Sequence, residues 1–168
     1  MKAWQYKGRV ISLLTTQRRL PNGVKTKLEI VVHPGAVLIV PFINFNKIIL
    51  IRQYRPVVQR YLYELPAGTL RAQESTIDCA QRELVEETGY RAKSFKKIGQ
   101  IFPVPGYSTE VITIYEAQNL RKQTGKKDPD EMISLCLLNR RQIREFFRSG
   151  KIVDAKTICA LAFCRLIP

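Results

Sequence analysis

The chain of 168 residues lacks several features that would identify common kinds of site. It has one histidine, His33, which we interpret as structural, so a nucleophilic site built around a pair of histidines is excluded. Its four cysteines are scattered without a CxxC pair, which favours free structural thiols over metal ligands or disulfides. No apolar run approaches the ~20 residues of a membrane span, and the first residues do not resemble a signal peptide. We therefore expect a soluble cytoplasmic protein with no membrane partner.

Acidic residues are also scarce: 14 stand against 28 lysines and arginines, which gives a net charge of +14. Six of the acids lie between residues 64 and 87, so the rest of the chain is more basic than the total suggests. The clearest basic group near the C-terminus is formed by Arg140, Arg141, Arg144, Arg148 and Lys151. Such a charge favours anionic substrates and could attract nucleic acid nonspecifically. Because aromatic residues are not interleaved with the basic ones and no RNA-binding motif is present, we expect no specific nucleic-acid partner.

The pattern of apolar residues predicts one α/β domain over residues 1–168. Alternation predicts strands at 4–16 and 25–32, joined by the PNG turn at 21–23 as an N-terminal antiparallel hairpin. Further strands are predicted at 36–40, 47–52, 61–65, 94–102, 111–117 and 132–138. Helices are predicted from about 75 to 88, between a cap at Ser75 or Thr76 and a stop at Gly89, and after the N-caps Asn139 and Asp154. Strands followed and interrupted by helices favour an α/β/α sandwich.

Three glutamates crowd the end of the helix predicted at 75–88: Glu83, Glu86 and Glu87. The helical period of 3.6 residues places their carboxylates within one arc of about a quarter turn. The opposite side of this helix is apolar and consists of Ile77, Ala80 and Leu84. One face is therefore expected to pack against the core, while the other carries an anionic cluster.

This cluster suits a hard divalent cation, because Mg²⁺ is usually held by a few carboxylates together with substrate phosphates and water. The alternative is an ordinary solvated helix face, on which Arg82 pairs with Glu86 four residues later. The spacing of the residues that precede the three glutamates favours the metal site.

Gly68, Glu74 and the run Arg82-Glu83-Leu84-x-Glu86-Glu87-x-Gly89 resemble the Nudix box throughout. The one departure is Tyr90, where that family more often has an aliphatic residue. The resemblance implies a Nudix-type α/β/α sandwich with a mixed sheet over residues 35–168. It also implies hydrolysis of a phosphoanhydride with Mg²⁺, or Mn²⁺, as cofactor.

Segments outside the box resemble ADP-ribose pyrophosphatases: HPGAV at 33–37, IRQYR at 51–55, ELPAG at 64–68 and PGYSTE at 105–110. Pro105 lies sixteen residues beyond Gly89, where that subfamily typically carries a proline. This resemblance implies a nucleoside diphosphate sugar as substrate, with ADP-ribose converted to AMP and ribose 5-phosphate. It further implies a homodimer in which residues 1–34 contribute the dimerising strands.

By the same resemblance, the metal ligands are the carboxylates of Glu83, Glu86 and Glu87 and the backbone carbonyl of Ala67. Glu86 either binds the metal or orients the other two ligands. Arg82 is expected to hold the glutamates in place through ion pairs.

The catalytic base is expected in the polar stretch 119–131, with Glu131 as first candidate and Asp128 or Asp130 as alternatives. This stretch could instead be an ordinary solvated connection.

The resemblance also suggests substrate contacts outside the box. Arg55 is expected to contact phosphate, although it could be a surface arginine at a strand edge. Trp4 is a candidate to stack on the adenine, although an aromatic residue near a chain start more often serves packing. Pro105 and Glu110 are the remaining predicted contacts.

Two other interpretations stay open. The chain could hydrolyse another nucleotide, such as GDP-mannose, a dinucleoside polyphosphate or an RNA 5′ end, which the charge of +14 would suit. It could also be a Nudix-fold protein that senses a nucleotide without hydrolysing it. Such proteins typically have a broken box, whereas this box is intact.

Overall fold

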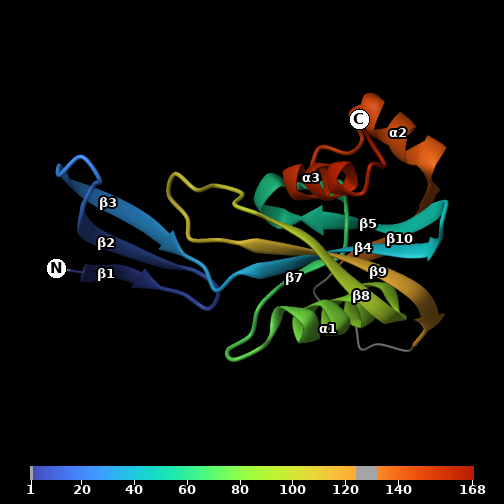
Figure 1. The fold of residues 1–168 in the computed structure, drawn as a ribbon, viewed down its shortest axis with the longest axis horizontal. Helices are drawn as coiled ribbons and strands as arrows, with labels where there is room; N and C mark the ends of the chain where they lie inside the picture. The colour runs from blue at the N-terminus through green and yellow to red at the C-terminus, as the bar shows by residue number, and fades with distance from the viewer. Residues whose placement is uncertain (1, 124–131) are drawn as a thin grey trace.

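The computed structural model of the chain describes residues 2–123 and 132–168 (Figure 1). The elements in chain order are β1 (Lys2–Lys7), β2 (Ser12–Arg19), β3 (Lys25–Val32), β4 (Ala36–Asn44), β5 (Lys47–Arg55), a 3₁₀ turn (Pro56–Val58), β6 (Arg60–Glu64), β7 (Ala67–Thr69), α1 (Thr76–Thr88), β8 (Tyr90–Ile101), β9 (Ile112–Lys122), β10 (Ile133–Asn139), α2 (Arg140–Arg148) and α3 (Ala155–Phe163). Among the described residues, no helix is long and apolar enough to cross a bilayer.

The central sheet is mixed, as predicted. Its strand order is β10-β5-β4-β9-β8, while β6 pairs with β5 and the short β7 pairs with β4. The pairing of β4 with β9 is parallel, and the other pairings in this sheet are antiparallel. Strand β4 lies in the middle and is buried over its first six residues, which explains its continuous apolar sequence.

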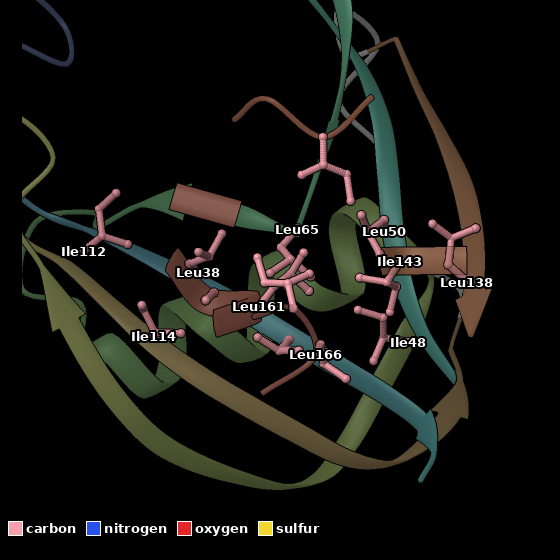
Figure 2. Close-up of a cluster of buried hydrophobic side chains, with 14 of the residues drawn as sticks. Leu38, Ile48, Leu50, Leu65, Ile112, Ile114, Leu138, Ile143, Leu161 and Leu166 are labelled. Atoms are coloured by element: carbon pink, nitrogen blue, oxygen red, sulfur yellow. The ribbon is translucent and has the colours of Figure 1, made fainter. Parts of the chain in front are cut away.

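Helices cover both faces of this sheet, so the predicted α/β/α sandwich is confirmed (Figure 1). Successive residues of a strand point to opposite faces, and β4 serves both layers. Val37 and Ile39 belong to the core cluster under α1. Leu38 and Val40 belong to the larger cluster under α2 and α3, which Figure 2 shows around Leu161.

Helix α1 begins and ends where the sequence predicts. The Ser75 hydroxyl caps it by accepting a hydrogen bond from the N–H of Asp78, and Gly89 ends it with φ at 68°. The chain passes directly from Gly89 into β8, so this strand begins at Tyr90 instead of Ser94. The short β7, which the sequence analysis did not predict, lies beside α1.

The N-terminal residues form a separate antiparallel sheet of three strands in the order β1-β2-β3. The predicted hairpin is present as β2 and β3, but the single strand predicted at 4–16 is wrong. The chain turns after β1, where the N–H of Gly8 donates to the carbonyl of Ile11 at 2.9 Å. A Cβ at Gly8 would lie 2.9 Å from that carbonyl oxygen, so the turn needs glycine.

This sheet projects from the sandwich and is tied to it through β3 (Figure 1). The N–H of Val31 donates to the carbonyl of Tyr107, and the N–H of Thr109 donates to the carbonyl of Val31. The connection between β8 and β9 therefore holds the N-terminal sheet next to the edge of the domain.

Candidate active site

The carboxylates of α1 lie directly against β7. Glu87 is 3% exposed and its Oε2 accepts a hydrogen bond from the N–H of Ala67 at 3.0 Å. A Cβ built on Gly68 would lie 1.9 Å from the carboxyl group of Glu83. Glycine at this position thus gives the Glu83 side chain the space that it occupies. The predicted metal ligands Ala67, Glu83 and Glu87 are brought together at this junction.

Arg82 organises the acidic side chains around it. Its Nε and Nη2 donate to the two carboxylate oxygens of Glu74 at 2.8 and 2.9 Å, in a bidentate pair. Its Nη1 donates to Glu83 and, at 2.9 Å, to Glu86. Its Nη2 also lies 3.4 Å from the carbonyl of Thr69 in β7. The structure thus contains ion pairs of Arg82 with Glu74, Glu83 and Glu86.

The sequence analysis assigned no role to Glu74, although it noted the residue at its fixed offset of eight from Arg82. Hydrogen bonds from Arg82 are the main reason that the pKa of Glu74 is lowered to about 2. Reciprocally, the hydrogen bonds from Glu74 are the main cause that raises the pKa of Arg82. The N–H of Arg71 also donates to Glu74, which fixes the loop before α1.

The three glutamates of the arc differ in burial. Glu86 is partly exposed, but Glu87 is buried with the apolar face, beside Leu84. The reason is that β7 supplies a backbone donor to Glu87 at the boundary between the packed and polar sides of the helix. Glu87 therefore belongs to the buried side of the helix as well as to the cluster of carboxylates.

A groove of about 840 Å³ lies in front of Arg82, Glu83 and Glu86. Its other lining residues come from the turn after β1, the end of β3 and the loop after β7: Gly8, Arg9, Val10, Ser12, Val32, His33, Pro34, Thr69, Leu70, Arg71 and Ala72. Arg71 lies 3.6 Å from Glu86 across this groove. The N-terminal sheet thus contributes one wall, together with a second basic side chain, Arg9.

The guanidinium of Arg55 is engaged by a protein carboxylate, Glu64, which is the main cause of the raised pKa of Arg55, and the charge of Glu87 contributes less. Its Nε and Nη2 donate to both oxygens of Glu64 at 2.8 and 2.6 Å. Glu64 is fully buried and also accepts from Lys156 of α3 at 2.6 Å. Burial alone would raise the pKa of Glu64, but the hydrogen bonds and charges of Arg55 and Lys156 lower it.

The other predicted contacts, Trp4, Pro105 and Glu110, do not line the groove. Trp4 is half exposed on β1, with the Lys7 ammonium 5.2 Å from its ring centroid. Pro105 lines a small hollow between β3 and the connection that precedes β9. Glu110 lies 3.9 Å from His33, which itself lines the groove.

His33 has the structural contact that we expected, because its Nδ1 accepts from the N–H of Gly35. The candidate bases Asp128, Asp130 and Glu131 lie outside the described residues.

Within residues 2–123 and 132–168, no three acidic, histidine or cysteine side chains already surround a common point as a metal cage. The ion pairs of Arg82 with Glu83 and Glu86 explain this arrangement. The donor set nevertheless fits Mg²⁺ or Mn²⁺, which prefer carboxylate and carbonyl oxygens. The absence of a side chain at Gly68 leaves room for the Glu83 carboxylate within this donor set.

The model of the NUDIX domain matches residues 32–160 of this chain. The chain belongs to the Nudix family. It is 36% identical over 163 residues to the ADP-ribose pyrophosphatase of Bacillus subtilis (strain 168), covering 96% of this chain and 88% of the relative. The same identity and coverage relate it to the methanol dehydrogenase activator of Bacillus methanolicus. A solved ADP compounds hydrolase shares its fold with a TM-score of 0.85 at 24% identity, covering 98% of this chain and 90% of that chain.

Replacement of Gly68 by alanine tests the contact between β7 and the Nudix helix. Since the added Cβ would overlap only the end of a flexible side chain, we expect Gly68→Ala to fold normally and to displace Glu83. Hydrolytic activity should fall by at least about 100-fold if Glu83 binds a metal ion that neutralises charge in the transition state. Steady-state kinetics and thermal unfolding would measure both effects. Gly106→Ala is the matched control, because a Cβ there meets nothing within 4 Å; equal activity of both variants would contradict the prediction.

Glu74 should stabilise the fold in a pH-dependent way. Its folded pKa of about 2 lies below the ordinary value of 4.5, so its contribution is full above about pH 5 and is lost as the pH falls towards 2. Glu74→Gln should therefore lower the free energy of unfolding by about 1–3 kcal/mol at pH 7 and by progressively less below pH 4.5. Urea unfolding at several pH values measures the difference. Glu29→Gln, at an exposed position on β3, should show no such loss; a pH-independent effect of Glu74→Gln would contradict the linkage.

Proposed function

We propose that the chain hydrolyses the pyrophosphate bond of a nucleoside diphosphate sugar and converts ADP-ribose to AMP and ribose 5-phosphate. The observation that carries the proposal is the carboxylate cluster that Arg82 and β7 assemble at the floor of a groove. The 36% identity to an ADP-ribose pyrophosphatase over nearly the whole chain supports this choice of substrate. Arg9 and Arg71 give the groove two cationic side chains for a diphosphate.

Glu83, Glu86 and Glu87, with the backbone carbonyl of Ala67, would hold Mg²⁺ or Mn²⁺. When bound, such a cation neutralises charge on the phosphates and lowers the pKa of water. Arg82 limits the rotation of its partner glutamates, because each is fixed by a charged hydrogen bond. The N–H of Ala67 does the same for the buried Glu87. The chain thus supplies oriented carboxylates before any substrate enters.

Proton transfer needs a further carboxylate, since the box glutamates already have partners. We place the general base at Glu131, with Asp128 and Asp130 as alternatives, on the acidic composition of this stretch. Arg55, held by Glu64 next to β7, remains our candidate for a phosphate contact through its remaining N–H donors. Trp4, Pro105 and Glu110 complete the proposed substrate contacts.

We also propose a cytoplasmic homodimer. The N-terminal sheet leaves several large apolar side chains exposed, among them Trp4, Tyr6, Val10, Ile11, Leu20 and Val24. A second copy of the chain would cover them, and residues 1–34 would then form the interface. The four cysteines are free, which suits a reducing compartment.

The substrate assay tests the proposed activity directly. With Mg²⁺ or Mn²⁺, the chain should form AMP and ribose 5-phosphate from ADP-ribose, and EDTA should abolish turnover. Glu83→Gln and Glu87→Gln should each lower kcat by at least about 100-fold with little change in Tm, whereas the exposed Glu145→Gln should match wild type. Activity of both site variants within threefold of wild type would reject the metal-ligand roles. A tenfold higher kcat/KM for GDP-mannose or 5′-triphosphate RNA would reject ADP-ribose as the preferred substrate.

Glu131→Gln tests the base. Loss of proton abstraction should lower kcat strongly with little change in KM, because the contacts to the diphosphate remain. The pH dependence of kcat separates this role from a structural one, since the acidic limb of the profile should disappear. If Asp128→Asn or Asp130→Asn loses activity instead, the role belongs to that residue; if all three variants stay active, the base lies elsewhere.

A further inference from the structure

Helix α2 carries a row of arginines on the side of the sandwich opposite α1 (Figure 1). Arg141, Arg144 and Arg148 are exposed, and their spacing of three and four residues places them on one helix face. Ile143 packs the other face into the core. Within the described part of the chain, none of these arginines forms an ion pair. Their charges are therefore available to an external anion.

Backbone contacts hold part of this surface in place. The Nε of Arg144 donates to the carbonyl of Leu166 at 3.3 Å, and the Nε of Arg140 donates to the carbonyl of Phe45 at 3.3 Å. Each bond uses the inner nitrogen and leaves the two terminal nitrogens as donors. A guanidinium fixed in this way loses less rotational freedom when it binds a phosphate.

An exposed aromatic residue lies next to Arg140, the residue that precedes this row. Phe45, at the turn between β4 and β5, is 88% exposed. It shares a hollow of about 390 Å³ with Arg140 and with the amide side chains of Asn44, Gln118 and Asn119. Glu116 also lines this hollow, where its carboxylate accepts from the Gln118 amide. Phe45 and Arg140 are 95 residues apart in sequence, so only the fold reveals an aromatic residue beside the basic ones.

A second hollow, of about 640 Å³, lies along α2. It is lined by Arg141, Arg144, Glu145, Arg148 and Ser149. Arg141 and Arg148 are seven residues apart, which corresponds to about 10 Å along a helix axis. This length exceeds that of a single phosphate, so the row suits a chain of phosphates.

We propose that α2 and the β4–β5 turn form a binding face for single-stranded nucleic acid. Phosphates lie along Arg141, Arg144 and Arg148, and a base stacks on Phe45 beside the amides. A groove of cationic side chains combined with an aromatic platform is the usual arrangement for sequence-tolerant binding of single strands. An acidic peptide would use the arginines but would have no need of the exposed ring. The face lies on the other layer from the carboxylate cluster, so this binding is separate from the proposed hydrolysis.

Fluorescence anisotropy with labelled U12 RNA and T12 DNA tests the proposal. The triple variant R141Q/R144Q/R148Q should weaken binding at least about tenfold. The slope of log K against log salt should become less steep by about two, because each lost phosphate contact removes ~0.7 from that slope. K93Q/K96Q/K97Q is the matched control, since it removes three exposed positive charges from β8. Phe45→Ala should weaken binding at least about fivefold, while Phe102→Ala, at another exposed ring, should not.

Other results would overturn the proposal. Equal weakening by the α2 and β8 triple variants would mean that net charge alone attracts the strand. Equal affinity for duplex DNA or polyglutamate, with no effect of Phe45→Ala, would mean a general polyanion surface. Thermal unfolding checks that each variant is folded, and turnover of ADP-ribose measured in parallel separates failure of this face from failure of the hydrolytic site.

Discussion

The arrangement of the site depends on one cation, the guanidinium of Arg82, placed among Glu74, Glu83 and Glu86. Carboxylates so close together repel each other. Arg82 offsets this repulsion and, through its bidentate pair with Glu74, is itself fixed to the loop before α1. Part of the repulsion within the cluster is thus offset inside the folded chain, before a metal or substrate contributes anything.

The sequence was sufficient to predict this cluster, because its members lie on one helix at spacings that helical geometry determines. A cap at Ser75 and a stop at Gly89 define that helix, and the period of 3.6 residues then groups Glu83 with Glu86. The sandwich was equally predictable, since β4 reads as a continuous apolar run and needs cover on both faces. Such features depend on local chemistry and on the burial of apolar surface.

Features that depend on contacts between distant segments could not be predicted in the same way. The burial of Glu87 requires a backbone donor from β7, a strand of three residues with no apolar pattern of its own. Arg55 donates to Glu64 on the neighbouring strand. Glu64 in turn accepts a hydrogen bond from Lys156 of α3, 92 residues later. Periodicity shows which face of an element is buried, but it does not show which polar group meets a buried carboxylate.

The two helical layers of the sandwich differ in charge, so the net charge of +14 is unevenly distributed over the molecule. On α1, Arg82 is surrounded by acids that its charge only partly offsets, so the site stays anionic and suited to a divalent cation. On α2, the arginines stand beside a single glutamate, Glu145. Without a bound cation, the excess negative charge of the first layer would repel a phosphate-rich ligand, whereas the second layer would attract it. Binding of phosphate therefore requires a divalent cation at the carboxylates of α1, whereas the arginines of α2 need none.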